Sequence, residues 1–380
     1  MIYLDSGATT LEKPPAVARA MAQAVGEMSS PGRGNYPASQ KAARTAYDCR
    51  EAAAELFHVP APEQVIFTCN ATHGLNIAIR TLVRPGCRVA VSGYEHNAVT
   101  RVLHSIPGVE IMVADAPLFR PEQTLEGFHT ALRRGVDAVI CNHVSNVFGC
   151  VQPVEELAGL CRRTHTPLIV DASQSAGILP VLLADWGAAF VAMPGHKGLY
   201  GPQGTGLLLC GAEASPLLYG GTGSASRRQT MPIDLPDRLE AGTHNMPGIA
   251  GLLEGLRFVS HAGVERIAQW ERRLTRRAEE GLARLPGVEV FADKTGQGQT
   301  GVLSFCVKGM DCEQVGEELA RRQIAVRAGL HCAPLAHRTA GTLKSGTIRI
   351  SPSVFNTEGQ INFFLREMRE ILRENTKKSV

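Results

Sequence analysis

The stretch 168–206 decides the fold and reads LIVDASQSAGILPVLLADWGAAFVAMPGHKGLYGPQGTG. An apolar run at 168–170 ends on Asp171, and a second apolar run at 188–193 leads within a few residues to Lys197. Short, continuous apolar runs of this kind predict buried parallel strands, so both charged residues follow the carboxyl ends of interior strands. Burying an ammonium ion is costly without a purpose, which makes Lys197 a candidate for chemistry.

A carboxylate and a lysine delivered by neighbouring strands are the two groups that pyridoxal phosphate (PLP) chemistry requires. The lysine amine forms a Schiff base with the cofactor, and the carboxylate keeps the pyridine nitrogen protonated so that the ring accepts electrons. A plain salt bridge between Asp171 and Lys197 at the end of a sheet explains the same two residues equally well.

Composition predicts a soluble globular protein. The chain has 380 residues, 44% hydrophobic and 20% charged, and its net charge of +3 is too small to favour nucleic acid or an anionic membrane as a partner. No apolar run is long enough to span a bilayer and no signal peptide is visible, so we expect a cytoplasmic location. The ten cysteines contain no CxxC pair, which argues against a disulfide framework and against a metal site.

Strand-like and helical patterns alternate from residue 64 to residue 171, which predicts a mostly parallel sheet with helices on both faces. Ligands of such sheets bind beyond the carboxyl ends of the strands. The turn at 70–76 joins a strand to a helix and is a candidate phosphate site, although an ordinary capped helix is the commoner explanation. The candidate residues at this edge are Thr72, His96, Asn146, Asp171, Gln174, His196 and Lys197.

The pattern changes after residue 206. Two small, polar loops at 220–224 and 240–245 surround a segment without clear periodicity, and an amphipathic helix at 264–285 then leads into a C-terminal α+β part. In that part we expect strands at 301–307, 324–327 and 347–351, and helices at 312–322 and 358–374.

Two residues of the C-terminal part are candidates for chemistry. Cys332 lies in a loop with Gly and Pro, so we expect it to be exposed, and the nearby Arg327 and His331 would favour its thiolate form. Arg349 lies inside a strand-like run and needs a partner, either the carboxylate of a substrate or a structural Asp or Glu.

Six motifs in order over nearly the whole chain resemble the cysteine desulfurases of the class V aminotransferase family, which are fold-type I PLP enzymes. They are YLDSGATT (3–10), HVSN (143–146), VDASQ (170–174), GHK (195–197), EAGTHN (240–245) and RAGLHCAP (327–334). The short cysteine loop is similar to that of the SufS-like branch. The resemblance implies an N-terminal segment (1–14) packing with the small domain, a large α/β domain (15–255) with a mostly parallel seven-stranded sheet, and a small α+β domain (256–380).

The resemblance also implies a role for each site residue. Lys197 would carry the Schiff base, Asp171 would pair with the pyridinium nitrogen, Gln174 would contact the phenolic oxygen and His96 would stack on the ring. The phosphate would be held by Thr72, His196 and, from a second subunit, Thr243. Asn146, Arg349, Arg327 and Ala8 would bind the substrate, and Cys332 would accept the sulfur.

The implied activity is conversion of L-cysteine to L-alanine, with a persulfide on Cys332 that passes to an acceptor, as in iron–sulfur cluster assembly. A homodimer with the site at its interface follows from the role of Thr243. Selenocysteine lyase, or another β-eliminating enzyme acting on L-selenocysteine or a related substrate, is the alternative, and a class V aminotransferase is a weaker one. Pro194 departs from the family, because many relatives have a phosphate-binding serine there, and the turn 70–73 departs as well.

Overall fold

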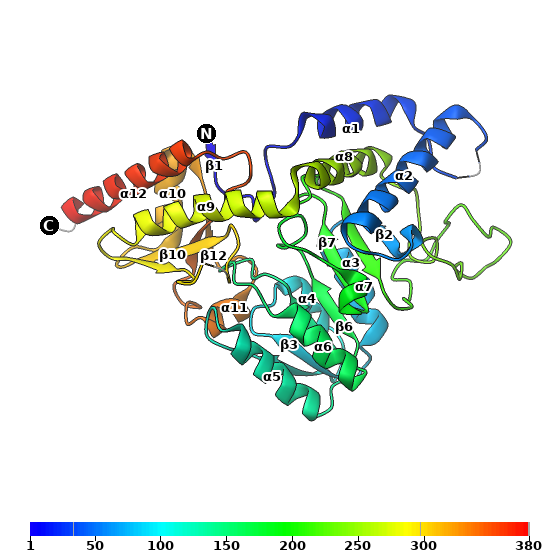
Figure 1. Cartoon of the computed structure of the whole chain (residues 1–380), viewed down its shortest axis with the longest axis horizontal. Coiled ribbons are helices and arrows are strands. Elements are labelled where there is room, and N and C mark those ends of the chain that lie inside the picture. Colours follow the sequence, from blue (N-terminus) through cyan, green and yellow to red (C-terminus); the bar gives the residue numbers. More distant parts are fainter. Residues whose placement is uncertain (33, 297, 379–380) are drawn as a thin grey trace.

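The structure, a computed structural model, describes residues 1–32, 34–296 and 298–378. Its larger part is built on a seven-stranded sheet of order β2-β8-β7-β6-β5-β3-β4 (Figure 1). All neighbouring strands are parallel except β8, which is antiparallel to both β2 and β7. The predicted mostly parallel sheet is therefore confirmed. Its strands are β2 (Val65–Thr68), β3 (Arg88–Ser92), β4 (Glu110–Ala114), β5 (Ala138–Asn142), β6 (Leu168–Asp171), β7 (Phe190–Pro194) and β8 (Gly206–Cys210).

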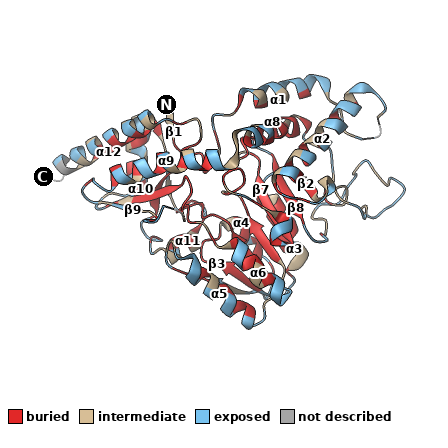
Figure 2. Ribbon diagram, viewed as in Figure 1, coloured by how far each residue is buried: buried red, intermediate tan, exposed pale blue. Residues whose placement is uncertain are grey.

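Helices cover both faces of this sheet because side chains of successive strand residues point to opposite sides. In β5, Val139 and Cys141 join one apolar cluster and Ile140 joins the other. The central strands β5, β6, β7 and β8 are buried throughout, whereas the edge strand β4 is mostly exposed or half-buried and the helices are exposed on their outer sides (Figure 2). The first face carries α2 (Pro37–Leu56), α5 (Pro121–Arg133), α6 (Val154–Thr164), α7 (Leu183–Trp186) and α8 (Met246–Ala262), and the second carries α3 (Ala71–Leu82) and α4 (Asn97–His104). Helix α1 (Pro15–Glu27) packs on α8.

The C-terminal part has its own core around an antiparallel sheet of order β12-β13-β10-β9. Phe305 of the sheet packs near Phe364 of the last helix, with ring centroids 6.2 Å apart. The elements are α9 (Val264–Leu282), β9 (Val288–Phe291), β10 (Leu303–Val307), α10 (Cys312–Arg321), β12 (Arg327–Gly329), α11 (Pro334–Thr339), β13 (Thr347–Ile350) and α12 (Glu358–Lys378).

The N-terminal segment belongs to this second core. Strand β1 (Ile2–Tyr3) pairs in parallel with β11 (Ile324–Ala325), and Leu4 is buried among the apolar residues of the small sheet and its helices. The expected single strand at 324–327 is wrong in one respect: β11 pairs with β1, and β12 pairs instead with β13. The pairing changes between residues 325 and 327 because β1 of the N-terminal segment pairs with 324–325, whereas 327–329 pair with β13.

A buried carboxyl group joins the two parts of the molecule. Glu271 of α9 is 6% exposed and accepts a hydrogen bond of 3.2 Å from the hydroxyl of Tyr200, which is itself fully buried. Within the described residues Glu271 forms no ion pair. Burial raises the pKa of Glu271 to about 8, and the bond from Tyr200 opposes this only in part.

This burial predicts a pH-dependent stability. Between about pH 4.5 and pH 8 an unfolded chain releases the Glu271 proton while the folded chain keeps it, so the free energy of unfolding falls as the pH rises. Glu271→Gln removes this ionisation and should stabilise the protein at pH 8 by roughly 4 kcal/mol, but by less than about 1 kcal/mol at pH 5. Urea denaturation of the cofactor-free protein at both pH values measures the difference, and Glu265→Gln, exposed on the same helix, is the control. A difference that does not change with pH would contradict the assignment.

Candidate active site

A cavity of about 180 Å³ lies beyond the carboxyl ends of β5, β6 and β7. Strands β6 and β7 are parallel neighbours, with Asp171 level with Ala192, so the two strands deliver Asp171 and the turn with Lys197 to the same edge. The predicted site residues that line this cavity are Ala8, Thr72, His96, Asn146, Asp171, Gln174, His196 and Lys197.

Lys197 and Asp171 form the polar centre of the cavity. Burial is the main cause that lowers the pKa of Lys197 to about 8, and the Arg349 charge lowers it further. The carboxylates of Asp171 and Asp5 act in the opposite direction. Asp171 is buried, and its Oδ1 accepts a 2.9 Å hydrogen bond from the amide of Ser173. A lysine with this pKa is a substantial fraction neutral near pH 8, as an amine nucleophile or base requires.

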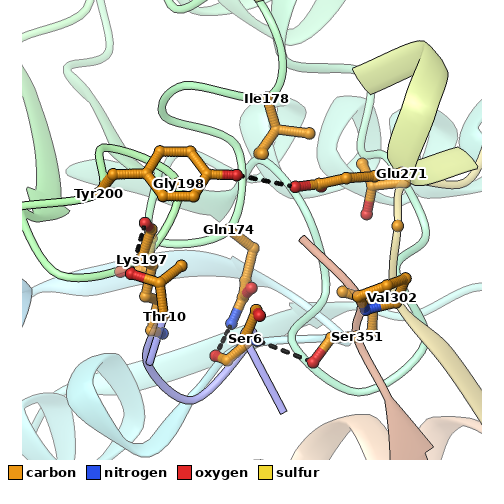
Figure 3. Close-up of a pocket in the computed structure, with 15 residues that line it drawn as sticks. Ser6, Thr10, Gln174, Ile178, Lys197, Gly198, Tyr200, Glu271, Val302 and Ser351 are labelled. Atoms are coloured by element: carbon orange, nitrogen blue, oxygen red, sulfur yellow. Dashed lines mark hydrogen bonds between the residues drawn. The ribbon is translucent and has the colours of Figure 1, made fainter. Parts of the chain in front are cut away.

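The N-terminal segment holds the Lys197 turn from its other side. Lys197 and Gln174 also line a second, narrow cavity of about 30 Å³ that extends toward Glu271 (Figure 3). The Thr10 hydroxyl donates to the carbonyl oxygen of His196 at 3.0 Å, and the Gln174 side-chain amide donates to the carbonyl oxygen of Gly7 at 2.9 Å.

His96 stands at the start of α4 as its N-cap. Its Nδ1 accepts a 3.0 Å hydrogen bond from the amide of Ala98, so a neutral ring carries its hydrogen on Nε2. Burial is the largest cause that lowers the pKa of His96, and Lys197 lowers it further against the opposing effect of Asp171. The cavity therefore has a neutral imidazole with a hydrogen-bond donor available at Nε2.

One part of the cavity wall is suited to an anion. It includes the first turn of α3, where Thr72 is exposed, and a helix N-terminus presents backbone N–H groups and a positive dipole. Among the described residues, His196 Nδ1 is buried without a hydrogen-bond partner. Burial is the main cause that lowers the pKa of His196 to about 4. Pro194 also lines the cavity and has no N–H to contribute.

Arg349 has the structural partner that the sequence left open. It is 2% exposed, its Nη2 donates to Asp5 Oδ1 at 2.8 Å, and its Nη1 donates to the carbonyl oxygen of Asn146 at 2.8 Å. Its Nε is buried without a partner in the described part of the chain. Arg327 binds the other carboxylate oxygen of Asp5 through Nε and Nη2, at 3.0 and 2.8 Å. One carboxylate thus joins both arginines, and nothing in the sequence pattern indicated Asp5 as their partner.

The Cys332 loop lies against the cavity. The carbonyl oxygen of Cys332 accepts a 2.8 Å hydrogen bond from the amide of Asn97, which directly follows His96. The carbonyl oxygen of His331 accepts a 2.7 Å bond from the side chain of Asn146. Both His331 and Cys332 adopt positive φ angles, 49° and 56°, which are unfavourable for residues with a Cβ and persist where the surroundings enforce them. Cys332 is exposed, as expected.

His331 does not assist the Cys332 thiol in the way the sequence suggested. Its ring is buried and stacked on His337 at 5.6 Å, and its Nε2 faces Thr347. Burial lowers the pKa of His331 to about 2, so it carries no positive charge at neutral pH. Arg327, which interacts electrostatically with Cys332, is the cation that remains on that side.

Thr243 does not line the cavity of its own chain. It is exposed and lines a separate cavity of about 170 Å³ next to β2 and α8. The loop that carries it is held by Glu240, which forms a buried, two-point ion pair with Arg50 at 2.6 and 2.8 Å. A part for Thr243 in the cofactor site therefore requires a second subunit.

Comparisons with known proteins agree with this geometry. The family model described as aminotransferase class-V matches residues 2–364. The apo structure of a cysteine desulfurase from Thermococcus onnurineus NA1 superposes with a TM-score of 0.90 at 30% identity, over 98% of this chain and 95% of that one. A probable cysteine desulfurase from Methanothermobacter thermautotrophicus is 32% identical over 97% of this chain and 94% of its own length. Another, from Mycolicibacterium paratuberculosis, is 32% identical over 98% of this chain, which spans only 55% of that relative.

The fold and the cavity are those of a PLP-dependent enzyme. The chain belongs to the class V aminotransferase family. The residues present fit the cofactor: an amine and a carboxylate line one cavity, whose wall also contains a histidine with an unpartnered nitrogen and a helix N-terminus. No helix among the described residues is long and apolar enough to cross a membrane.

The electrostatics of Lys197 give a direct test. In the cofactor-free protein, the amine should react with acetic anhydride with a midpoint near pH 8. Asp171→Asn removes the charge that favours the ammonium form, so the midpoint should move to lower pH. Competitive labelling followed by peptide mass spectrometry measures both values. Asp185→Asn, at an exposed position outside the cavity, should leave the midpoint unchanged. An equal shift in both variants would show that the effect is not local.

Proposed function

We propose that the protein is a PLP-dependent cysteine desulfurase, which converts L-cysteine to L-alanine and takes up the sulfur as a persulfide on Cys332. The observation that carries the proposal is the hydrogen bond between the carbonyl oxygen of Cys332 and the amide of Asn97. It holds the main chain of an exposed cysteine against the residue that follows His96, and His96 lines the cavity that contains Lys197. An aminotransferase needs no thiol at this point. The relatives named above as cysteine desulfurases support the same activity.

The cavity residues divide between the cofactor and the substrate. Lys197 would bind the cofactor covalently, Asp171 would hold its ring nitrogen in the protonated form, Gln174 would contact its phenolic oxygen, and His96 would stack on its ring. Thr72 and His196 would hold the phosphate. When bound, PLP supplies an electron sink that stabilises negative charge at the α-carbon of an amino acid.

Lys197 and Cys332 perform the two chemical tasks of the chain itself. The Lys197 amine, whose pKa is lowered to about 8, takes the α-proton of L-cysteine. The Cys332 thiolate then attacks the sulfur of the substrate: a sulfur–sulfur bond forms, the carbon–sulfur bond breaks, and its electron pair stays on carbon, which is protonated. The products are L-alanine and a persulfide on Cys332, and no external oxidant or reductant is needed.

The substrate carboxylate would lie at Asn146 and Arg349. Arg349 Nε is a charged donor that is buried without a partner in the described residues, whereas the Asn146 side-chain nitrogen already donates to the carbonyl oxygen of His331. Arg349 would therefore be the main contact of the carboxylate. Ala8, which lines the cavity, and Arg327 would complete the contacts. Because Asp5 already binds both arginines, the carboxylate would share them with Asp5.

The proposal also covers the family branch, the domain division, the oligomeric state and the sulfur acceptor. We place the chain in the SufS-like branch because the loop between β12 and α11 is short and ordered. We also propose the division into 1–14, 15–255 and 256–380; Leu4 of the first segment packs in the C-terminal core, and the boundary at 255 falls within α8. A homodimer would supply Thr243 to the partner's phosphate site, and an acceptor protein in the cytoplasm would take the persulfide sulfur.

Replacement of the thiol tests the activity. Cys332→Ala should reduce alanine formation from L-cysteine at least 100-fold and leave the visible absorbance of bound PLP intact, because the cavity itself is unchanged. The assay measures alanine together with sulfide released by dithiothreitol. Cys69→Ala, at the other exposed cysteine, is the matched control and should keep full activity. Full alanine formation by Cys332→Ala would refute the sulfur transfer. If that variant loses L-cysteine turnover but keeps turnover of L-selenocysteine, the selenocysteine lyase alternative gains support.

The subunit origin of Thr243 can be tested by mixing two defective variants. Lys197→Ala and Thr243→Ala homodimers should both be impaired, the first in covalent PLP binding and the second in PLP affinity by roughly tenfold. If Thr243 acts across the dimer, a hybrid of the two variants contains one site with both native residues and should recover about half of the wild-type activity per dimer. If Thr243 acts within its own chain, the hybrid recovers none. Thr222→Ala, in the same long loop, is the control for general loop damage.

A further inference from the structure

Glu95 is a buried acidic residue beside the cavity that the mechanism above does not use. It lies in the turn between β3 and α4, directly before His96, and is 0% exposed. Its Oε1 is 2.6 Å from Ser92 Oγ and accepts a 2.7 Å hydrogen bond from the amide of Asn142 at the end of β5. Its Oε2 is buried without a partner, and no arginine, lysine or histidine forms an ion pair with it in the described residues.

The hydrogens in this cluster can be counted. Ser92 Oγ has one hydrogen but makes two short contacts, with Glu95 Oε1 at 2.6 Å and with Asn142 Oδ1 at 2.7 Å. The Asn142 amide cannot supply a hydrogen to Ser92, because its Nδ2 donates to the carbonyl oxygen of Tyr94 at 2.9 Å and so directs Oδ1 toward Ser92. The second hydrogen must therefore come from Glu95. A carboxylic acid hydroxyl at Oε1 satisfies every contact: it donates to Ser92, and Ser92 donates to Asn142.

We propose that Glu95 is a positioning residue that works as a neutral carboxylic acid, locking the turn that carries His96 to the end of β5 without adding a second negative charge next to Asp171. The role rests on the proposed function only in that His96 is taken to stack on PLP. Asn142 links the turn that carries His96 to the cavity, because it binds this turn, lines the cavity and lies level with Asp171 in the sheet.

Burial and the nearby Asp171 carboxylate favour the neutral form of Glu95. Burial is the largest cause that raises the pKa of Glu95 to about 8, and the Asp171 carboxylate on β6 raises it further, against the hydrogen bonds from Ser92 and Asn142. On β5 the Cys141 thiol interacts electrostatically with Glu95, and burial raises the pKa of this thiol, so it stays uncharged. Ionisation above pH 8 would remove the hydrogen donated to Ser92 and place two carboxylates side by side.

This arrangement also connects to the Cys332 loop. The turn held by Glu95 continues into His96 and Asn97, and the amide of Asn97 binds the carbonyl oxygen of Cys332. Loss of the neutral acid would therefore loosen both the ring that covers the cofactor and the support of the sulfur-accepting loop.

Infrared spectroscopy of the cofactor-free protein tests the protonation state directly. The difference between wild type and Glu95→Gln at pH 7 should contain the carbonyl-stretching band of one protonated carboxylic acid, which disappears with a midpoint near pH 8. A difference that contains only carboxylate bands at pH 6 would overturn the proposal. This measurement requires neither PLP nor catalytic activity.

PLP affinity tests the positioning role. For wild type, the dissociation constant of PLP, followed by absorbance, should increase about tenfold per pH unit above pH 8, because the competent form decreases by that factor. Glu95→Gln should weaken binding a few-fold at pH 7, since an amide cannot both donate to Ser92 and accept from Asn142 through one atom, but should abolish the alkaline loss. Glu110→Gln, exposed on the neighbouring strand β4, should behave as wild type.

The outcomes separate this proposal from the proposed function. If Glu95→Gln loses PLP affinity above pH 8 as steeply as wild type does, the positioning role is overturned, whatever the enzyme's activity. If the infrared band and the pH profile are as expected but L-cysteine yields no alanine, the desulfurase assignment fails and the role of Glu95 stands.

Discussion

The carboxylate of Asp5 is the contact on which the relative placement of the two parts depends. It comes from the N-terminal segment and binds Arg349 of β13 and Arg327 of β12, and Arg349 in turn binds the carbonyl oxygen of Asn146 in the large sheet domain. Arg349 is almost fully buried, so removing one partner would leave an uncompensated charge, which costs about 3–5 kcal/mol. The Asp5 carboxylate therefore links the N-terminal segment, the small sheet and Asn146 of the cavity wall.

The same contact explains how a reactive loop stays in place. The carbonyl oxygen of Asn146 accepts a hydrogen bond from Arg349. The Asn146 side chain donates to the carbonyl oxygen of His331, one residue before Cys332. Together with the Asn97 amide, this fixes two successive carbonyl groups of a loop in which two residues have positive φ angles. Only the main chain is held, so the Cys332 side chain remains exposed and free to approach a substrate sulfur and then an acceptor.

The sequence predicted those features that depend on local pattern. Strands β6 and β7 were recognisable as continuous apolar runs, and their parallel pairing brings Asp171 and Lys197 to one edge. Helix α8 was missed because it is buried on most sides and lacks a polar face with helical spacing. The pairing of Asp5 with Arg349 was missed because the partners are 344 positions apart. His331 was misjudged since burial, which removes its charge, cannot be inferred from a neighbouring cysteine.

The groups that remain charged when buried determine which ligands the cavity accepts. The surrounding fold keeps most ionisable groups uncharged: burial lowers the pKa of His96, His196 and His331 and raises that of Glu95. The groups that stay charged at the site are the cations Lys197, Arg327 and Arg349 and the carboxylates of Asp171 and Asp5. Both carboxylates already have partners in the chain: Asp171 accepts from the amide of Ser173, and Asp5 binds the two arginines. The unpartnered buried atoms at the site include a charged donor, Arg349 Nε, and an uncharged acceptor, Asn146 Oδ1. Because the three cations outnumber the two carboxylates, the site favours a ligand with anionic groups and disfavours a cationic ligand of the same size.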